Sequence, residues 1–277
     1  MTLVTPADLA ALLRSDAPPV VLDVRWRLDA PDGSAAYREG HVPSAQYVSL
    51  DDELAAHGAP TDGRHPLPDA EALQEAARRW GVDDGSTVVV YDDWSSFAAA
   101  RAWWLLADAG VDARVLDGGL SAWRDAGLAL EQGDSSAPRR GSVTLQPGRF
   151  AKLTMGEAGA LAADGLLLDA RAGERYRGET EPIDPRAGHI PGAVSAPTAD
   201  NTDAAGRLLP ADELRARFAA LGARDDEPVG VYCGSGITAS HEALALMVAG
   251  FTPALYPGSW SQWSNHPHLP VATGAQP

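Results

Sequence analysis

The amino-acid sequence contains an internal repeat, and this repeat constrains the fold more than any other feature. Four segments of the first half return in the second half in the same order: VVLDVRW at 20–26 returns as LLLDARA at 166–172, YREGHVPSAQYV at 37–48 as PRAGHIPGAVSA at 185–196, TVVVYDDW at 87–94 as PVGVYCGS at 228–235, and LDGGLSAW at 116–123 as YPGSWSQW at 256–263. The offset stays at about 140 to 150 residues, which indicates a tandem duplication of one structural unit of about 125 residues.

Each half has the pattern of an α/β domain. Short β-branched runs that end in Asp or Tyr alternate with helical stretches such as DAEALQEAARRWG at 69–81 and ADELRARFAALG at 211–222, and both stretches end at glycine. This alternation predicts two tandem α/β domains, each with a mainly parallel sheet flanked by helices on both faces. The Gly-, Pro- and Ser-rich stretch between the halves predicts a first domain at 1–132, a linker at 133–149 and a second domain at 150–277.

The charge of the chain limits its partners. The formal charge is −16 at pH 7, whereas nucleic acids and anionic membranes need a basic surface, so neither is expected as a partner. The N-terminal stretch lacks a basic region followed by an apolar core, and no run approaches 18 apolar residues, so we expect neither a secretion signal nor a membrane span. One cysteine forbids an internal disulfide and fits a reducing compartment, so we expect a cytoplasmic protein. A monomer is the expected oligomeric state, although no sequence feature determines it.

Cys233 is this single cysteine, and it lies between a strand-like and a helix-like stretch. We expect a strand at 229–232 and a helix at 239–250, so that the loop CGSGIT follows the carboxyl end of a strand, where chemistry gathers in open α/β sheets. Gly234 and Gly236 let successive N–H groups turn inward and hold an anion. A cysteine in such a loop is expected to react as a thiolate, and the alternative is a buried cysteine that only packs.

The motifs resemble those of the tandem rhodanese sulfurtransferases over nearly the whole chain. GHVPSA at 40–45 and GHIPGA at 188–193 match the recurrent GHIPGA element of that family, and GSWSQW at 258–263 matches its closing GSW-x-x-W. The resemblance implies two rhodanese-like domains, the second of which carries a persulfide-forming cysteine, Cys233. In the first domain Asp92 takes the place of this cysteine, which implies that the first domain is inactive.

The composition of the cysteine loop separates two sulfur donors within that family. Thiosulfate enzymes carry a basic loop similar to C-R-K-G-x-T, whereas 3-mercaptopyruvate enzymes carry C-G-S-G-x-T, and CGSGIT here has no positive charge. The resemblance therefore implies 3-mercaptopyruvate as a small anionic donor, with loop contacts from Gly234, Gly236, Ile237 and Thr238. The sulfur would then pass to a thiophilic acceptor such as cyanide, a small thiol or reduced thioredoxin.

Arginine is the side chain expected to bind the carboxylate of this donor, because its planar fork can form two parallel hydrogen bonds. The stretch ARAGERYRGETEPIDPRAGHIPG at 170–192 contains four arginines. Arg175 matches the family arginine before an aromatic-x-Gly element. Arg186 lies in the interval that holds a second family arginine, although closer to the histidine than expected. Arg171 and Arg177 are more simply interpreted as solvated charges.

The resemblance also assigns a proton relay to the first half of the chain. The family has an aspartate soon after its first HIPGA element and a histidine before x-L-P, and these match Asp51 in YVSLDDEL and His65 in GRHPLP. With Ser235 they would form a Ser–His–Asp relay that moves protons while Cys233 attacks sulfur. The alternative for His65 is a histidine on a surface turn.

Particular residues bear on the alternative functions. A cysteine-dependent phosphatase needs an arginine six residues after the cysteine, and Ala239 stands there. A thiosulfate sulfurtransferase and a protein that only carries a persulfide to a partner both stay open as alternatives.

His41 and His189 recur as a pair, which favours a shared structural task over catalysis. The chain lacks metal-ligand spacing and a G-x-G-x-x-G after a strand, so neither a metal nor an organic cofactor is expected.

Overall fold

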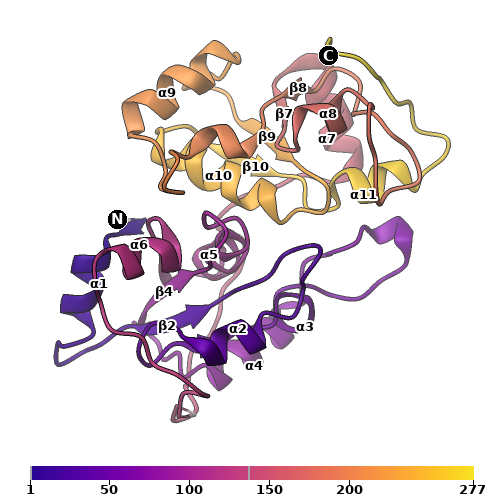
Figure 1. The fold of residues 1–277 in the computed structure, drawn as a ribbon. Helices are drawn as coiled ribbons and strands as arrows, with labels where there is room; N and C mark the ends of the chain where they lie inside the picture. The colour runs from indigo at the N-terminus through magenta and orange to yellow at the C-terminus, as the bar shows by residue number, and fades with distance from the viewer. Residues whose placement is uncertain (1, 137) are drawn as a thin grey trace. The chain divides into compact units, whose positions relative to one another are not determined.

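The computed structural model describes residues 2–136 and 138–277, which form two compact units (Figure 1). The first unit contains the chain up to Ala56, Pro68–Arg149 and Asp203–Leu208, and the second contains His57–Leu67, Phe150–Thr202 and Leu209–Pro277. Each half of the chain therefore contributes one short segment to the unit that the other half builds. The expected continuous domains, 1–132 and 150–277, need correction at these two segments, because each segment packs with the other unit.

In the described part of the chain, the first unit has a five-stranded sheet whose neighbouring strands are all parallel, in the order β1-β5-β4-β2-β3. The strands are β1 (Leu3–Val4), β2 (Val20–Asp23), β3 (Gln46–Tyr47), β4 (Thr87–Tyr91) and β5 (Asp112–Leu116). The central strand β4 reads TVVVY and is buried from its second residue onward. Such continuous apolar runs are typical of parallel strands that are covered on both faces.

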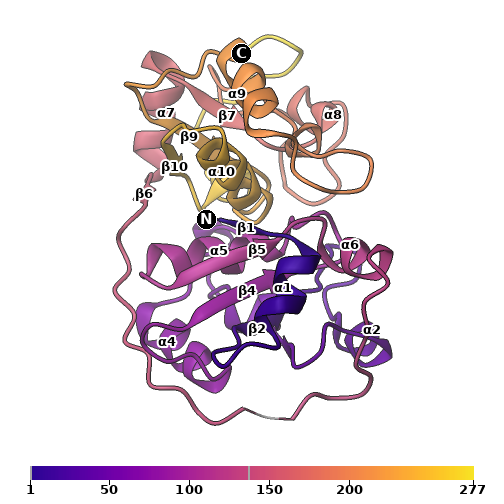
Figure 2. The same cartoon turned by 90° about the vertical axis from the view of Figure 1, so that its left-hand side faces the viewer.

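Helices cover both faces of this sheet, as Figure 2 shows. They are α1 (Pro6–Leu12), α2 (Ser34–Glu39), α3 (Leu50–Glu53), α4 (Ala70–Arg79), α5 (Ala99–Asp108) and α6 (Gly119–Asp125). Side chains alternate along a strand, so Val21 and Val89 point to one face, where they pack with Leu9 of α1 and Trp123 of α6. The opposite face of β4 and β5 packs against α5.

The residues described for the second unit form another five-stranded parallel sheet, in the order β6-β10-β9-β7-β8. The strands are β6 (Ala151–Lys152), β7 (Leu167–Asp169), β8 (Val194–Ser195), β9 (Val229–Tyr232) and β10 (Pro253–Leu255). This order repeats the order of the first sheet strand for strand. The predicted architecture, two tandem α/β domains with parallel sheets, is confirmed.

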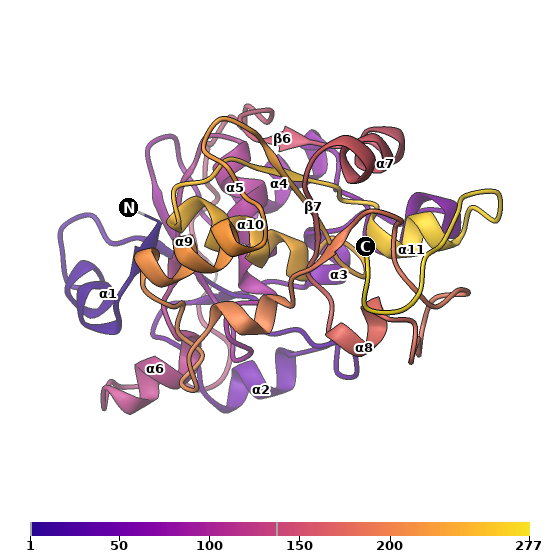
Figure 3. The same cartoon turned by 90° about the horizontal axis from the view of Figure 1, so that it is seen from above.

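The helices of the second unit are α7 (Met155–Asp164), α8 (Gly173–Tyr176), α9 (Ala211–Ala220), α10 (Thr238–Val248) and α11 (Ser259–Ser264), with 3₁₀ turns η1 (Pro60–Asp62) and η2 (Thr198–Asn201). On one face of the sheet, Ala158 of α7 and Trp260 of α11 pack with Tyr232 of β9. The helix α9 lies beside α10 (Figure 3). None of the helices in the described residues is long and apolar enough to cross a membrane.

The helices lie where the sequence pattern predicts them. The expected helix at 69–81 is α4, whose first turn is capped by Asp69, because its carboxylate accepts a hydrogen bond from the N–H of Ala72 at 2.7 Å. The helix ends just before Gly81, whose φ of +88° is a backbone conformation that favours glycine. The expected strand at 229–232 is β9, and the expected helix at 239–250 is α10 at Thr238–Val248.

The described part of the predicted linker at 133–149 runs along the surface of the first unit. The N–H of Gly141 donates to the carbonyl of Arg78 at 2.8 Å, and the N–H of Gln146 donates to the carbonyl of Ala109 at 2.9 Å. The side chain of Arg78 donates to the carbonyl of Val143 at 2.9 Å. These contacts, together with the buried side chains of Val143 and Leu145, hold the described part of this stretch against the first unit, although it forms no helix or strand.

The repeated histidines perform the same structural task in both units. The Nδ1 atom of His41 lies 2.9 Å from the carbonyl oxygen of Tyr37, and the two rings stack with centroids 4.0 Å apart. In the second unit, Nδ1 of His189 lies 2.8 Å from the carbonyl oxygen of Tyr176, and the ring centroids are 3.8 Å apart. Each histidine therefore fastens the chain that leads into an edge strand to the helix before it.

Candidate active site

Cys233 lies directly after β9 and is 1% exposed. The start of α11 holds the main chain on both sides of it. The N–H of Cys233 donates to Oγ of Ser259 at 3.1 Å, and its carbonyl accepts from the N–H of Trp260 at 2.9 Å. The N–H of Ser261 donates to the carbonyl of Gly234 at 2.8 Å. The GSW motif therefore fixes the position of the cysteine loop, although it lies 25 residues further along the chain by the spacing of Cys233 and Gly258.

The sulfur of Cys233 faces the main chain of its own loop. The N–H of Gly236 donates to Sγ at 3.1 Å, and Gly236 has a φ of +81°, which favours glycine. Ile237 and Thr238 continue from there into α10, a helix of 11 residues. A main-chain N–H and a helix N-terminus both favour negative charge on the sulfur, so the geometry suits a thiolate or a persulfide anion.

The equivalent loop of the first unit holds an anion of its own. The carboxylate of Asp92 is fully buried and accepts hydrogen bonds at 2.7 to 2.9 Å from the N–H groups of Trp94, Ser96, Ala98 and Ala99. Burial raises the pKa of Asp92 to about 6, against the effect of these N–H donors. The carbonyl of Asp92 accepts from Leu120 at 2.9 Å, as that of Cys233 does from Trp260. The carboxylate thus fills the first loop, which contains no sulfur.

His65 and Ser235 are brought together in the second unit. The segment His57–Leu67 belongs to this unit, and Nδ1 of His65 lies 2.8 Å from Oγ of Ser235. Both side chains are buried. Asp51 lies in α3 of the first unit, where its Oδ1 accepts a hydrogen bond from Nε1 of Trp26 at 3.0 Å. The third member of the relay therefore stays a prediction.

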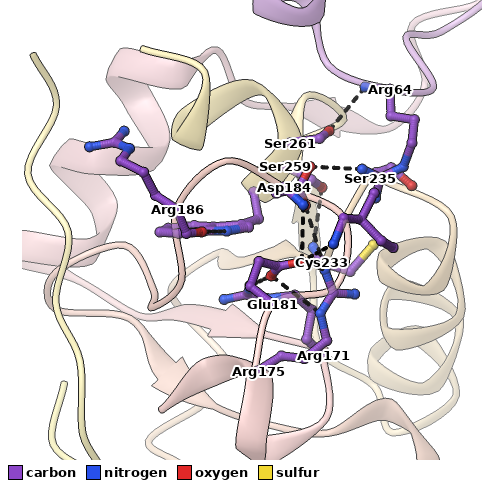
Figure 4. A network of polar contacts seen from close by, with 12 residues as sticks. Arg64, Arg171, Arg175, Glu181, Asp184, Arg186, Cys233, Ser235, Ser259 and Ser261 are labelled. Atoms are coloured by element: carbon purple, nitrogen blue, oxygen red, sulfur yellow. Dashed lines mark hydrogen bonds and ion pairs between the residues drawn. The ribbon is translucent and has the colours of Figure 1, made fainter. Parts of the chain in front are cut away.

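Arg175 lies beside the cysteine loop (Figure 4). A Cβ atom added to Gly234 would be 3.3 Å from one terminal nitrogen of Arg175 and 3.8 Å from the other. The guanidinium is held by Glu181 at 2.6 Å, and Asp184 lies 3.5 Å away. The structure thus places the arginine that the sequence singled out against the main chain next to Cys233.

Arg64 is a second cation at this site, and it was not among the residues predicted from the sequence. One of its terminal nitrogens lies 3.3 Å from the same added Cβ at Gly234, and the other donates to Oδ1 of Asp184 at 2.7 Å. The one signal in the sequence is that Arg64 directly precedes His65 in GRHPLP. Its place beside Arg175 could not be predicted, because Arg64 lies far along the chain from the other arginines. Local spacing does not show which distant segments are in contact in the fold.

Arg186 is placed differently from the expectation that it binds the donor. Its guanidinium donates to four main-chain carbonyls at 2.8 to 2.9 Å, those of Trp263, Ser264, His266 and Leu269. In Figure 4 the side chain points away from Cys233. The geometry therefore gives Arg186 a structural task, since its donors are used to hold the chain that follows α11.

The two remaining arginines of this stretch differ from each other. Arg171 is 3% exposed and pairs with the buried Asp169 at 2.6 Å, so the interpretation as a solvated charge is wrong for this residue. The first unit contains the equivalent pair, Arg25 and Asp23, at 2.7 Å. The repeat of LDVR at 22–25 as LDAR at 168–171 could therefore have indicated a buried ion pair. Arg177 pairs with Glu179 at the surface at 2.7 Å, as a solvated charge does.

The charges at the site come from side chains that balance one another. Arg64 and Arg175 face the buried carboxylates of Glu181 and Asp184, so the four groups together carry no formal net charge. Burial raises the pKa of Asp184, and Arg64 opposes this shift. Within the residues that the structure describes, no group of three or more His, Cys, Asp or Glu side chains is arranged to hold a metal ion.

Comparison with known proteins gives the family of the chain. The model of the rhodanese-like domain matches it twice, at residues 5–126 and 154–266. The chain is 48% identical over 278 residues to a putative thiosulfate sulfurtransferase, SseB, of Mycobacterium tuberculosis, with 98% of this chain and 97% of that one covered. It is also 48% identical over 281 residues to a probable 3-mercaptopyruvate sulfurtransferase of Pseudomonas aeruginosa, with 98% of each chain covered.

A solved structure agrees with these matches. The crystal structure of SseA from Escherichia coli, described as showing the rhodanese fold and the catalytic mechanism of 3-mercaptopyruvate sulfotransferases, superposes with a TM-score of 0.82 at 31% identity. The alignment covers 94% of this chain and 99% of that one. Both halves of the sequence match the same domain, and the relatives are matched over nearly their whole length. The chain belongs to the rhodanese family and consists of two rhodanese-like domains in tandem.

Proposed function

We propose that the protein is a sulfurtransferase that takes sulfur from 3-mercaptopyruvate and carries it as a persulfide on Cys233. The observation that carries this proposal is the surroundings of the cysteine loop. The loop itself has no cation, and the two guanidinium groups beside it come from Arg64 and Arg175, which pair with carboxylates. An uncharged cysteine loop with arginines on one side suits a donor whose carboxylate lies away from its reacting sulfur.

The proposed reaction begins with the Cys233 thiolate. It attacks the thiol sulfur of 3-mercaptopyruvate, an S–S bond forms, and the C–S bond breaks with its electron pair on carbon, which leaves pyruvate as its enolate. A proton converts the enolate to pyruvate. The N–H of Gly236, which donates to Sγ in the structure, would stabilise the anionic persulfide that remains.

The contact between His65 and Ser235 supports a role in proton transfer. Ser235 lies in the cysteine loop, His65 contacts it from the segment His57–Leu67, and the two side chains can exchange a proton across 2.8 Å. We propose that they protonate the enolate, with Asp51 as the expected third member of the relay. A thiophilic acceptor, such as cyanide, a small thiol or a thioredoxin, then attacks the outer sulfur and releases the Cys233 thiolate.

Thiosulfate is the competing donor, because the names of two equally similar relatives differ on this point. Thiosulfate carries two negative charges, and a loop that binds it is expected to add cations near the sulfur. Positions 234 and 235 are Gly and Ser here, so the local charge argues against it. A protein that only carries a persulfide would need neither an arginine beside the loop nor a buried His–Ser pair.

Steady-state kinetics with cyanide as acceptor test this function. We expect thiocyanate formation with a kcat/KM for 3-mercaptopyruvate at least about tenfold above that for thiosulfate. Cys233→Ser should abolish turnover, and mass spectrometry should find one added sulfur atom on Cys233 of the wild type after donor alone. A higher kcat/KM for thiosulfate would reject the donor, and a single turnover without multiple turnovers would favour the carrier.

The chemistry of the cysteine bears on the cellular compartment. A single reactive cysteine must stay reduced to accept sulfur, so we propose that the protein works in the cytoplasm. We propose separately that it is a monomer. Fractionation of cells and size-exclusion chromatography test these two points.

A further inference from the structure

We propose that Ser259 is a positioning residue for Cys233: its backbone is strained, and the strain serves a hydroxyl that holds the main chain of the cysteine. This inference rests on the proposed function and deepens it, because it names the side chain that fixes the direction of the sulfur. Ser259 begins α11 and lies beside the cysteine loop (Figure 4). It was not among the residues predicted from the sequence.

The backbone of Ser259 has a conformation that favours glycine. Its φ is +55°, in the left-handed region where the Cβ of an L-residue crowds the main chain. The repeat aligns Ser259 in YPGSWSQW with Gly119 in LDGGLSAW, and Gly119 has a φ of +56°. Glycine adopts this conformation at no steric cost, so the first unit has the same backbone without the strain. The strain at Ser259 therefore points to a function of its side chain.

The hydroxyl of Ser259 joins the ends of two strands. It accepts a hydrogen bond at 3.1 Å from the N–H of Cys233, directly after β9. It donates one at 3.0 Å to the carbonyl of Tyr256, directly after β10. Ser259 is fully buried, so water does not replace either contact. A hydroxyl has a single proton, and this one is directed to Tyr256, so Ser259 holds the loop and does not supply a proton to the reaction.

The first unit holds its equivalent loop in another way. A Cβ added to Gly119 would lie 2.4 Å from the carbonyl oxygen of Asp92, so there is no room for a serine. The carboxylate of Asp92 accepts from four N–H groups of its own loop and fixes that loop from within. The sulfur of Cys233 must stay free to react, so its loop needs a support from outside, and Ser259 supplies it.

This support fixes the direction of the sulfur. The N–H of Cys233 is held by Ser259, and its carbonyl is held by the N–H of Trp260 at 2.9 Å, so the peptide units on both sides of the cysteine are fixed. Sγ then lies 3.1 Å from the N–H of Gly236. Without the hydroxyl, a buried N–H would be left unpaired, and the peptide before Cys233 would turn toward another acceptor. The sulfur would lose the contact that favours its negative charge.

Ser259→Gly and Ser259→Ala test this proposal as a pair. Both remove the hydroxyl, but only Ala keeps a Cβ at positive φ, so Ser259→Gly should melt several degrees above Ser259→Ala. We expect kcat with 3-mercaptopyruvate to fall about tenfold in both variants, with KM changed less than about twofold. An equal loss of activity at different melting temperatures is a result that a purely structural role would not give.

Ser44→Gly is the matched control. Ser44 also has a positive φ, +65°, and it is exposed in the first unit. The repeat aligns it with Gly192, whose φ is +88°, so the substitution relieves the same kind of strain. We expect the kcat of the wild type and a melting temperature at least as high. A fall of kcat in Ser44→Gly similar to that in Ser259→Gly would count against a specific role of Ser259.

A second readout does not depend on the donor. Iodoacetamide alkylates the Cys233 thiolate, because the sulfur forms a bond to carbon and iodide leaves with the electron pair. We expect the alkylation rate to fall about fivefold or more in both Ser259 variants and to stay unchanged in Ser44→Gly. If the wild type does not use 3-mercaptopyruvate, the proposed function fails, and the alkylation rate still decides whether Ser259 positions the sulfur.

Two results would overturn the proposal. One is a kcat and an alkylation rate of Ser259→Gly that both lie within about twofold of the wild type. The other is activity that follows the melting temperature, with Ser259→Ala losing much more than Ser259→Gly, which would leave Ser259 a role in stability only.

Discussion

Nδ1 of His65 lies 2.8 Å from Oγ of Ser235, a residue 170 positions further along the chain. The contact lies within one compact unit, because the segment His57–Leu67 packs there and not with the half of the sequence that contains it. A titratable side chain from the first half therefore stands against the cysteine loop of the second.

Ser235→Ala tests the proton transfer through this pair. We expect kcat with 3-mercaptopyruvate to fall by about 10²-fold, with KM nearly unchanged, because the variant loses a proton path and keeps the arginines. Stopped-flow measurement of pyruvate release checks this. His65→Gln should produce a similar loss, and the double variant should lose little more, since the two residues act as one unit. Full activity in both single variants would contradict the relay.

Gly234→Arg tests why this loop lacks a cation. The new side chain would start 3.3 Å from nitrogens of both Arg64 and Arg175, so like charges would crowd one point. We expect kcat/KM for 3-mercaptopyruvate to fall by at least about 10-fold and the preference to shift toward thiosulfate, because the loop then holds a cation near the sulfur. Gly234→Ala is the control, because it adds only the Cβ, and it should keep most activity. An unchanged preference between the two donors in Gly234→Arg would contradict selection of the donor by the charge of this loop.

Arg186→Gln distinguishes a structural role of Arg186 from a role in binding the donor. The substitution removes charged hydrogen bonds to the four carbonyls that follow or end α11. We expect the free energy of unfolding to fall by about 2–4 kcal/mol, as for loss of several charge-assisted bonds, while the KM for 3-mercaptopyruvate changes less than about threefold. Urea unfolding and steady-state kinetics check the two parts. A large rise of KM at unchanged stability would restore Arg186 as a donor ligand.

Glu242→Gln tests a buried acid in α10 that the proposed reaction does not use. Burial raises the pKa of Glu242 from 4.5 to about 7, although Asn201 donates to it at 2.7 Å and Arg217 lies 3.6 Å away. The folded protein keeps this proton up to about pH 7, whereas the unfolded chain loses it near pH 4.5. The contribution to stability is therefore present at low pH and is lost as the pH rises between these values.

The variant Glu242→Gln carries no titratable group at this position, so it lacks the loss of stability between about pH 4.5 and 7. We expect Glu242→Gln to match the wild type near pH 4.5 and to exceed it above pH 7 by up to about 3 kcal/mol in the free energy of unfolding. The neighbouring His241 has the opposite slope, because burial lowers its pKa to about 3 and its stability contribution is lost as the pH falls below 6.5. Urea unfolding at several pH values checks the difference between the two proteins, and a difference independent of pH would contradict the shifted pKa.

Much of the fold followed from the sequence, because its signals are local. The repeat of GHVPSA and GHIPGA and the alternation of valine-rich strands with helices predicted two parallel sheets, and the strand orders β1-β5-β4-β2-β3 and β6-β10-β9-β7-β8 agree. The loop after β9 and the start of α10 were also predicted, since a strand, glycines and a helical stretch adjoin Cys233. These features depend on neighbours in the chain, and the order of residues encodes them.

The partners of the arginines depended on tertiary structure alone. Arg175 and Arg186 lie in one stretch of sequence, yet one faces Gly234 and the other holds the chain after α11. Arg64 lies far from both in the sequence and reaches the same point as Arg175. The sequence by itself determined the repeat, the sheets and the reactive loop. The exchange of short segments between the units decided which charges surround that loop, because such contacts join residues whose spacing in the chain carries no pattern.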